Sequence, residues 1–290
     1  MAMTADVDCF SGTVGEVWSD IARRLTEAGV SNGENEAKEL LACALGIDRK
    51  AVGLRRGGLC PAPARAFLNS LLAQRLAHVP LAYLLGEWDF LDMTLTVTPD
   101  VLIPRPETED LFQWMASTPF SLPVTAVADV GTGAGGLALA AARRWPGARV
   151  TAMDLSSSAL AVAQWNARRH GVEARLDFRR ADLLDGVNDQ EVDVIAANLP
   201  YVTTAEMADL APEVLKEPRR ALDGGPDGLS LIRRLIPQAF RTLRKGGSLF
   251  LESGQGQSAA VAHEMTRVGF AAVSTARDFA GIERFIRGIR

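Results

Sequence analysis

The spacing of apolar residues divides the chain into three regions. Over residues 14–77 the apolar side chains recur at helical intervals, as at Val17 and Ile21, and Gly and Pro residues lie between the segments. Over residues 87–98 apolar and polar residues alternate, which is typical of a short β-hairpin. We therefore predict a small helical domain at residues 1–86, linked by the hairpin to the remainder of the chain.

Beyond residue 121 the pattern changes to apolar strands and helical stretches in strict alternation. This alternation predicts a parallel β-sheet with helices on both faces, an α/β domain that we assign to residues 99–290. The predicted strands cover residues 126–130, 149–153, 176–178, 192–197, 248–252, 271–275 and 284–287. Ligands of such sheets bind beyond the carboxyl ends of the strands, so the loops at these ends form the expected site.

Composition narrows the class of protein. The 290 residues are 48% hydrophobic and 23% charged, which is ordinary for a globular protein of two domains. No apolar run is long enough to span a membrane, and Asp6 and Asp8 stand where a secretory signal would be basic, so we expect a cytoplasmic protein. The net charge of −4 argues against direct binding of nucleic acid. Cys9, Cys43 and Cys60 lack the spacing of metal ligands, so we expect reduced thiols and no metal site.

A glycine-rich turn joins the first predicted strand of the α/β domain to the next helix. It consists of Gly131, Thr132, Gly133, Ala134 and Gly135. Glycine permits positive φ and lets a ligand approach the backbone closely, and the N-terminus of a helix offers N–H donors. On this feature alone a nicotinamide enzyme, a methyltransferase and a merely tight strand–helix connection are equally good interpretations.

Two further strand ends carry residues that suit a nucleoside. Asp154 follows the second strand, where a carboxylate accepts hydrogen bonds from both hydroxyls of a ribose. The alternative, a cap on the helix that begins near Ser156, does not exclude that role. Asp182 and Leu183 follow the third strand and offer an acceptor for an adenine amino group and an apolar wall. These residues suit both NAD and S-adenosylmethionine.

The end of the fourth strand distinguishes the two cofactors. This strand runs directly into the tetrad Asn198-Leu199-Pro200-Tyr201. A planar NH2 group needs two acceptors, which the Asn198 side-chain oxygen and the Leu199 main-chain carbonyl supply. Tyr201 is suited to cover the face of the substrate, and Pro200 fixes the backbone. We predict methyl transfer from S-adenosylmethionine to a planar, amide-like nitrogen at this tetrad, and the alternative is a β-turn closed by Asn and Pro with a packed Tyr.

These motifs, together with others, resemble those of the HemK/PrmC release factor glutamine methyltransferases over nearly the whole chain. The most specific shared segment is residues 101–109, Val-Leu-Ile-Pro-Arg-Pro-Glu-Thr-Glu. The other shared residues are Pro80, Tyr83, Gly86, Phe90, the glycine turn, the tetrad, Glu217-Pro218, Ala221-Leu222, Gly224-Gly225, Asp227-Gly228-Leu229, Gly281 and Arg284. The resemblance implies a class I S-adenosylmethionine-dependent methyltransferase fold, which is Rossmann-like, with an N-terminal helical domain joined by a β-hairpin.

The resemblance also implies an activity and roles for residues. The activity is that of a protein-(glutamine-N5) methyltransferase, which methylates the side-chain amide of the glutamine in the Gly-Gly-Gln motif of peptide chain release factors. The helical domain would recognise this protein substrate. The implied roles place residues 131–135 and Asn198 on the cofactor, Asp154 on its ribose, Asp182 and Leu183 around its adenine, and the tetrad around the glutamine.

Some features leave alternatives open. Leu199 stands where the family usually has proline, and the resulting tetrad also resembles that of adenine methyltransferases acting on ribosomal RNA, so an adenine or another amide is an alternative acceptor. Ser253 is a second departure, because the family tends to have an aliphatic residue there. A dinucleotide-dependent oxidoreductase would explain the glycine turn but leaves the tetrad without a role. We interpret Arg105 and Glu107 either as part of the wall near the active site or as a structural ion pair that fixes the linker.

The tetrad suggests a mechanism. An amide nitrogen is a poor nucleophile, but the methyl group of a sulfonium is already strongly activated, so the enzyme needs no strong base. Our hypothesis is an in-line displacement in which Asn198 and the Leu199 carbonyl orient the NH2 group and favour positive charge on its nitrogen.

Overall fold

The computed structural model describes residues 10–121 and 123–290. The expectations for Cys9, Asp6 and Asp8 concern residues outside these ranges. Among the residues that the structure describes, no helix has the length and apolar character needed to cross a membrane. The same residues include no cluster of three or more His, Cys, Asp or Glu side chains arranged to hold a metal ion.

Contacts between residues divide the chain into two compact units. The helical unit is the described chain up to Gly86 together with Pro212–Lys216. The α/β unit is Glu87–Ala211 together with Glu217–Arg290. The domain boundaries drawn from the sequence at residues 86, 98 and 290 stay predictions.

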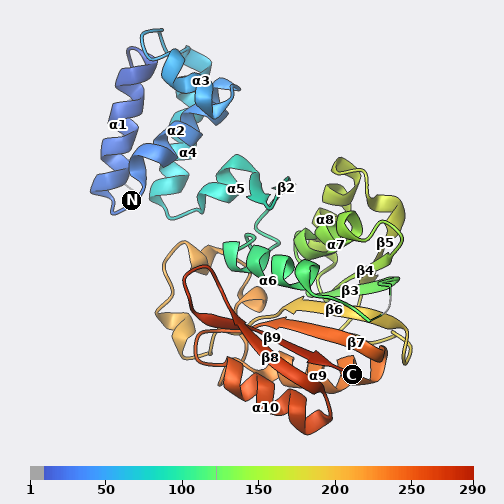
Figure 1. The fold of residues 1–290 in the computed structure, drawn as a ribbon. Helices are drawn as coiled ribbons and strands as arrows, with labels where there is room; N and C mark the ends of the chain where they lie inside the picture. The colour runs from blue at the N-terminus through green and yellow to red at the C-terminus, as the bar shows by residue number, and fades with distance from the viewer. Residues whose placement is uncertain (1–9, 122) are drawn as a thin grey trace. The chain divides into compact units, whose positions relative to one another are not determined.

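The helical unit is helical over residues 14–77, as its apolar spacing predicts, and has one more helix, α5 (Leu81–Leu85), beyond that range. The helices before it are α1 (Val14–Glu27), α2 (Gly33–Leu45), α3 (Arg49–Leu54) and α4 (Ala62–Leu76) (Figure 1). A capping box begins α1, since Thr13 Oγ1 accepts from the Glu16 N–H at 3.3 Å and the Glu16 carboxylate accepts from the Thr13 N–H at 2.7 Å. Ile21 and Leu25 are fully buried in one core with residues of α2 and α4, so these helices stabilise one another by burying apolar surface.

One charged side chain is buried in the helical unit. Arg75 of α4 is 2% exposed. Its Nε donates to Glu36 on α2 at 2.6 Å, and its Nη2 donates to Glu213 at 2.6 Å. Because a buried guanidinium needs paired acceptors, this triad attaches the short segment Pro212–Lys216 to the helices.

The α/β unit carries a hairpin, a seven-stranded sheet and the helices around it (Figure 1). Its strands are β1 (Glu87–Phe90), β2 (Met93–Thr96), β3 (Ala126–Val130), β4 (Arg149–Asp154), β5 (Leu176–Arg180), β6 (Val192–Asn198), β7 (Leu243–Glu252), β8 (Ala271–Arg277) and β9 (Glu283–Ile289). Its helices are α6 (Pro106–Ser117), α7 (Gly136–Arg144), α8 (Ser157–Arg169), η1 (Glu173–Arg175), η2 (Glu206–Ala208), η4 (Arg219–Ala221), α9 (Ser230–Thr242) and α10 (Ser258–Val268), whereas η3 (Val214–Lys216) belongs to the helical unit. The predicted hairpin and α/β class are confirmed.

The prediction of an entirely parallel sheet is wrong at one strand. The strand order is β5-β4-β3-β6-β7-β9-β8, and β9 is antiparallel to both of its neighbours. Only residues 278–282 separate β8 from β9, which is too short for a helical crossover and forces a hairpin. A second difference is that β7 begins at Leu243 rather than at residue 248, because its first residues include a polar Lys-Gly-Gly stretch that reads as a loop.

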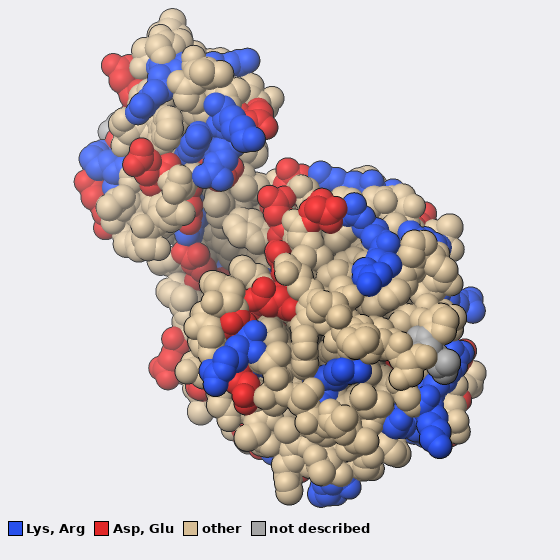
Figure 2. Space-filling view, in the orientation of Figure 1, with Lys and Arg blue, Asp and Glu red and all other residues tan. Residues whose placement is uncertain are grey.

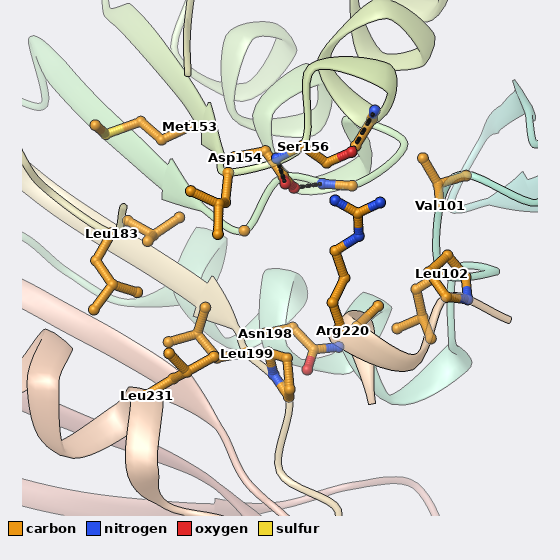
Figure 3. Close-up of a pocket in the computed structure, with 18 of the residues that line it drawn as sticks. Val101, Leu102, Met153, Asp154, Ser156, Leu183, Asn198, Leu199, Arg220 and Leu231 are labelled. Atoms are coloured by element: carbon orange, nitrogen blue, oxygen red, sulfur yellow. Dashed lines mark hydrogen bonds between the residues drawn. The ribbon is translucent and has the colours of Figure 1, made fainter. Parts of the chain in front are cut away.

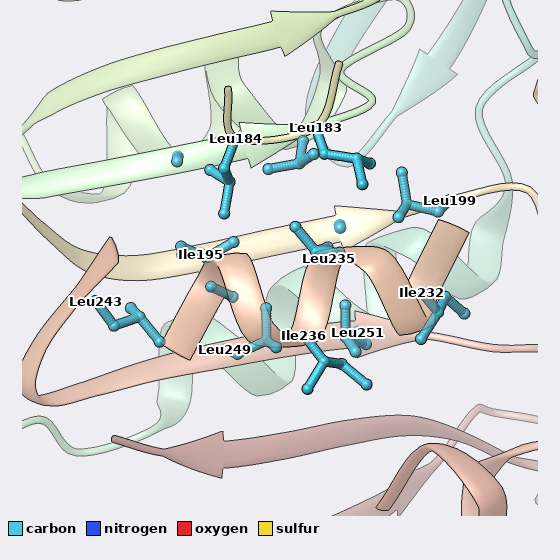
Figure 4. Packing of buried hydrophobic residues seen from close by; sticks show 14 of the residues in the cluster. Leu183, Leu184, Ile195, Leu199, Ile232, Leu235, Ile236, Leu243, Leu249 and Leu251 are labelled. Carbon is cyan, nitrogen blue, oxygen red and sulfur yellow. The ribbon is translucent and has the colours of Figure 1, made fainter. Parts of the chain in front are cut away.

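Alternate residues of the central strands serve the two faces of the sheet. Leu249 and Leu251 of β7 point into one core with Ile232, Leu235 and other residues of α9 (Figure 4). Phe250 lies between them in sequence and contacts Trp114 of α6 edge-on, with ring centroids 5.4 Å apart. Successive side chains of a strand point to opposite faces, so α9 and α6 cover different sides of the sheet, as predicted.

The hairpin is held against the sheet by one buried amide. Asn166 of α8 is fully buried. Its Nδ2 donates to the carbonyls of Thr96 and Ala134, both at 2.9 Å, and its Oδ1 accepts from the Thr96 N–H at 2.7 Å. Asn166 therefore ties β2 to the glycine turn.

The sequence pattern does not predict helix α6, because Pro104 and Pro106 stand close together at its start. Pro106 occupies the first turn, where its missing N–H costs no hydrogen bond. Arg105 precedes this proline and has the extended backbone that is usual at such positions, and it is the N-cap of the helix. The consequence for the site is that Thr108 lies in the first turn of α6.

Candidate active site

A pocket opens beyond the carboxyl ends of β3, β4 and β6, at the edge of the sheet where ligands of such folds bind (Figure 3). Six predicted cofactor residues line it, namely Gly131, Gly133, Asp154, Asp182, Leu183 and Asn198. Apolar side chains form much of the remaining wall, including Met153 and Leu231. Thr132 and Ala134 line a smaller adjoining pocket instead, and Gly135, which lines neither pocket, is the N-cap of α7.

The glycine turn is pinned to the neighbouring strand. The Gly131 and Thr132 N–H groups donate to the Met153 carbonyl at 2.8 and 2.9 Å. Gly131 has φ 76°, and a Cβ there would lie 3.0 Å from the Leu199 side chain. Gly133 also has positive φ, and nothing lies within 4 Å of its Cβ position, so its bare backbone faces open space in the pocket.

A buried carboxylate fixes the inner side of this turn. Asp129 is 2% exposed, and its Oδ2 accepts from the Thr132 hydroxyl at 2.6 Å and from the Ala138 N–H at 3.0 Å. Burial raises the pKa of Asp129 to about 7. Its two hydrogen bonds join the turn to the first residues of α7.

Asp154 is arranged to receive a diol. One carboxylate oxygen accepts from the Gly133 N–H at 3.1 Å and the other from the Ser156 N–H at 2.8 Å (Figure 3). Each carboxylate oxygen has a further lone pair, which is what the two hydroxyls of a ribose require. The alternative that Asp154 caps the next helix is wrong, because Ser156 is the N-cap of α8 and its Oγ accepts from the Ala159 N–H.

Asp182 and Leu183 lie in the wall of the same pocket. Asp182 Oδ2 accepts from Arg234 at 2.7 Å, which holds the carboxylate in place. Leu183 has φ 56° and is 7% exposed. A left-handed conformation is costly for leucine and concentrates at functional sites, so the strained backbone supports a role for this residue in shaping the pocket.

The tetrad follows β6 without interruption. Leu199 is buried beside Gly131, and Leu199 and Pro200 line the main pocket. Asn198 Nδ2 donates to the Thr108 hydroxyl at 2.7 Å. Tyr201 is outside the lining of the main pocket, and its hydroxyl donates to Glu252 Oε1 at 3.3 Å. Burial, and then the charge of Glu252, raises the pKa of Tyr201 above its usual value.

The backbone carbonyls of Pro200 and Tyr201 are contacted closely by glycines and by one side-chain amide. Gln257 Nε2 donates to the Tyr201 carbonyl at 2.9 Å. A Cβ on Gly224 would lie 2.5 Å from the Pro200 carbonyl oxygen, and one on Gly228 would lie 2.1 Å from the Tyr201 carbonyl oxygen. The Gly-Gly-Pro-Asp-Gly-Leu segment thus needs glycine in order to approach the tetrad closely.

Arg105 and Glu107 do not pair with one another as the linker interpretation required. Arg105 Nη2 donates to Glu217 Oε1 at 2.5 Å, and the Ile103 N–H donates to the other oxygen of Glu217 at 3.0 Å. Glu217 is 5% exposed, so this pair fixes the loop before α6. Arg105 lines the smaller pocket together with Thr108 and Asn198, which leaves a role beside the substrate as a prediction.

These residues fit S-adenosylmethionine as the molecule in the main pocket. The spare lone pairs of the Asp154 carboxylate match the hydroxyls of a ribose, and the apolar wall matches an adenine. The exposed glycine backbone leaves room for the part of the cofactor that must pass close to the turn. Arg220 extends from η4 toward Asp154 and brings a positive charge to the pocket (Figure 3).

Comparison with known proteins agrees with both units. Residues 16–86 match the model of the PrmC N-terminal domain, and residues 111–228 match that of the methyltransferase small domain. The release factor glutamine methyltransferase of Geobacter sulfurreducens is 40% identical over 266 residues, 91% of this chain and 92% of that protein. The chain belongs to this family. The enzyme of the same name from Mycolicibacterium smegmatis is 40% identical over 271 residues, 92% of this chain and 94% of its own.

Membership of the release factor glutamine methyltransferase family confirms the class I methyltransferase fold and S-adenosylmethionine as the cofactor. Solved structures agree on the fold. The catalytic domain of hMettl16 in complex with MAT2A 3'UTR hairpin 6 has a TM-score of 0.56 at 16% identity, covering 76% of this chain and 81% of that one. A methyltransferase from Pyrococcus furiosus has a TM-score of 0.51 at 20% identity, covering 67% and 87%.

Several residues of this family member's site were missed by reasoning from the sequence. Thr108, Glu217 and Gly224 were noted only as shared motif positions, and Glu252 only for the departure beside it. Asn166 and Gln257 carried no signal, because a single polar residue in a helix does not reveal which backbone groups it meets. Thr108 and Glu252 are 144 positions apart in the chain, and only the folded sheet brings them together.

Proposed function

We propose that this protein transfers a methyl group to the side-chain amide nitrogen of the glutamine in the Gly-Gly-Gln motif of peptide chain release factors. The main support for this acceptor comes from Asn198, which lines the pocket. Its Nδ2 donates to Thr108, and its carbonyl oxygen is therefore left to accept from an NH2 group. The identity of about 40% to release factor glutamine methyltransferases over about 90% of the chain supports the acceptor. A cytoplasmic location belongs to this proposal.

The pocket would hold the methyl donor, and the tetrad would hold the amide that accepts the methyl group. When bound, S-adenosylmethionine supplies a methyl group on a positively charged sulfur. Asn198 Oδ1 and the Leu199 carbonyl accept the two N–H bonds of the amide, which holds its NH2 group and favours positive charge on the nitrogen. The amide nitrogen becomes positively charged only when its new bond to the methyl carbon forms. Its extra proton therefore leaves after this step, to water. Pro200 fixes the backbone directly after the Leu199 carbonyl.

The roles assigned to the remaining residues follow from position. Residues 131–135 and Asn198 would contact the cofactor, Asp154 its ribose, and Asp182 and Leu183 its adenine. Tyr201 would complete the glutamine site with its ring, since Glu252 holds the hydroxyl. Arg105 would face the substrate from the smaller pocket, and Glu107 lies close enough for its charge to raise the pKa of Glu252. The helical unit would bind the body of the release factor.

An adenine amino group is the second candidate acceptor. It presents the same planar NH2 group, so the two acceptors of the tetrad do not separate it from glutamine. The overall negative charge disfavours it, because nucleic-acid binding relies on clustered Lys and Arg. On the face that Figure 2 shows, acidic and basic side chains are interspersed in small groups.

The test is labelled methyl transfer from S-adenosylmethionine into purified release factor. The matched control is the same release factor with glutamate in place of the motif glutamine, and an adenine-containing RNA is offered in parallel. We expect label in the intact release factor alone. Equal labelling of the two release factors would reject the glutamine, and label in the RNA alone would establish the second acceptor.

A thermal-shift comparison of S-adenosylmethionine with NAD tests the cofactor separately. A selective ligand stabilises the folded state in proportion to its occupancy, so S-adenosylmethionine should raise the melting temperature and NAD should not. Stabilisation by NAD alone would reject methyl transfer and restore the oxidoreductase interpretation.

A further inference from the structure

Two side chains, Thr108 and Glu252, form one chain of hydrogen bonds with Asn198 and Tyr201 of the tetrad. Asn198 Nδ2 donates to Thr108 Oγ1 at 2.7 Å, and Thr108 Oγ1 donates to Glu252 Oε2 at 2.8 Å. Tyr201 donates to the other oxygen, Glu252 Oε1, at 3.3 Å. Asn198 ends β6, Thr108 lies on α6 and Glu252 ends β7, while Tyr201 follows β6. Glu252, which bonds to both Thr108 and Tyr201, is fully buried. One carboxylate therefore contacts both the amide and the ring of the tetrad, directly or through a single hydroxyl.

When Glu252 is ionised, this chain of hydrogen bonds can run in one direction only, and the observed bonds run that way. An ionised carboxylate has no hydrogen to give, so Thr108 must donate its single hydrogen to Glu252. The Thr108 oxygen then has only lone pairs for Asn198, which must turn its NH2 toward Thr108. The amide carbonyl is consequently left on the other side. An asparagine free to flip would also present its NH2 there, and an NH2 cannot accept from the NH2 of a substrate.

We propose that Thr108 and Glu252 are positioning residues that lock the flip state of the Asn198 amide, so that its carbonyl oxygen faces the acceptor nitrogen. This inference rests on the proposed function for its effect on turnover, and on the hydrogen bonds alone for the flip state. It gives a chemical reason for threonine within the 101–109 segment. The hydroxyl of Thr108 acts as an adaptor, accepting from an amide and donating to a carboxylate.

Other groups around Glu252 fit this assignment. Glu107 on α6 and Arg284 on β9 are the charged groups that act on it, with opposite signs. Neither replaces the partners named above, because Arg284 Nε donates to Asp278 at 2.7 Å. Thr108 is 7% exposed, so water does not readily replace its hydroxyl.

The first experiment replaces the hydroxyl of Thr108 and measures turnover and cofactor affinity separately. Thr108→Val keeps the shape of the side chain and removes the adaptor, whereas Thr108→Ser keeps the hydroxyl. We expect Thr108→Val to lower kcat about tenfold, the effect of losing one oriented hydrogen bond. Thr108→Ser should recover kcat to within about a factor of two, and the Kd for S-adenosylmethionine should change less than about twofold in both.

The matched control is Thr242→Val. Thr242 is also fully buried, but its hydroxyl has no hydrogen-bond partner in the described structure and lies at the end of α9. We expect this variant to keep the wild-type kcat. Wild-type kcat in Thr108→Val, failure of Thr108→Ser to recover it, or a parallel loss of cofactor affinity would each overturn the proposal.

A second measurement reads the flip state without any acceptor. In protein labelled with ¹⁵N-asparagine, the side-chain NH2 signal of Asn198 is assigned by its absence from Asn198→Asp. We expect its hydrogen exchange to be slow in the wild type and in Thr108→Ser, and at least about tenfold faster in Thr108→Val. Equal exchange in all three would overturn the lock. Slow exchange in a wild type that methylates no release factor would instead reject the proposed function while retaining the lock.

Discussion

Replacing Glu252 with glutamine should make the protein more stable than the wild type at alkaline pH, while the two differ least in acid. Glu252 is fully buried, and burial raises its pKa from the ordinary 4.5 to about 7. Between these values the folded state holds a proton that the unfolded state has lost. The contribution of Glu252 to the free energy of unfolding is therefore fully present below about pH 4.5 and is lost as the pH rises toward about 7. Above that pH the contribution changes little.

The size of this effect follows from the two pKa values. Each pKa unit corresponds to about 1.4 kcal/mol, so the full cost of the buried charge is about 3 kcal/mol. Most of it falls between about pH 5 and about pH 8, where we expect a change of about 2 to 3 kcal/mol. Glutamine keeps the size of the side chain and one acceptor oxygen for Thr108, and it does not titrate.

The assay is urea unfolding of the wild type and Glu252→Gln at several pH values, with the difference in unfolding free energy plotted against pH. Taking this difference cancels the titration of all other groups, including the buried Asp129. Glu34→Gln is the control, because that side chain is exposed on α2 and its replacement removes no buried charge. A difference that stays constant from acid to alkaline pH would refute the reasoning.

Three further substitutions test other parts of the structure. Asn198→Ala should lower kcat by roughly 10²–10³, as loss of one preorganised group that stabilises developing charge does, with a smaller change in cofactor Kd, and unchanged turnover would contradict its role. Arg75→Met should destabilise the helical unit by about 3 to 5 kcal/mol in urea unfolding, because both glutamate partners lose their cation. Gly224→Ala should lower both melting temperature and kcat, since its Cβ would meet the Pro200 carbonyl at 2.5 Å, and wild-type values for both would contradict this packing.

The sequence alone predicted the parts of the fold that periodic patterns encode. The apolar strands β3 and β6 and the helices of the helical unit have strong periodicity, and the structure places them at or close to the predicted residues. The antiparallel β9 could not be predicted from alternation, because strand direction depends on the length of one connection. Helix α6 was missed because two prolines in Ile103 to Glu109 suggest a loop, although one of them is a helix start.

The candidate site divides in the same way. Residues at strand ends, such as Asp154 and Asn198, were predictable because the carboxyl ends of parallel strands meet at one edge. The groups that hold them were not predictable. Thr108 and Glu252 belong to elements far apart in the chain, and their meeting depends on where α6 packs against β7.

The most direct test of the central claim is mass spectrometry of a release factor after incubation with the enzyme and S-adenosylmethionine. The proteolytic peptide that contains the Gly-Gly-Gln motif should gain the mass of one methyl group, and fragmentation should locate it on the glutamine side chain. The matched reaction with Asn198→Ala should leave that peptide largely unmodified. A methyl group found on any other residue, or full modification by the variant, would contradict the account.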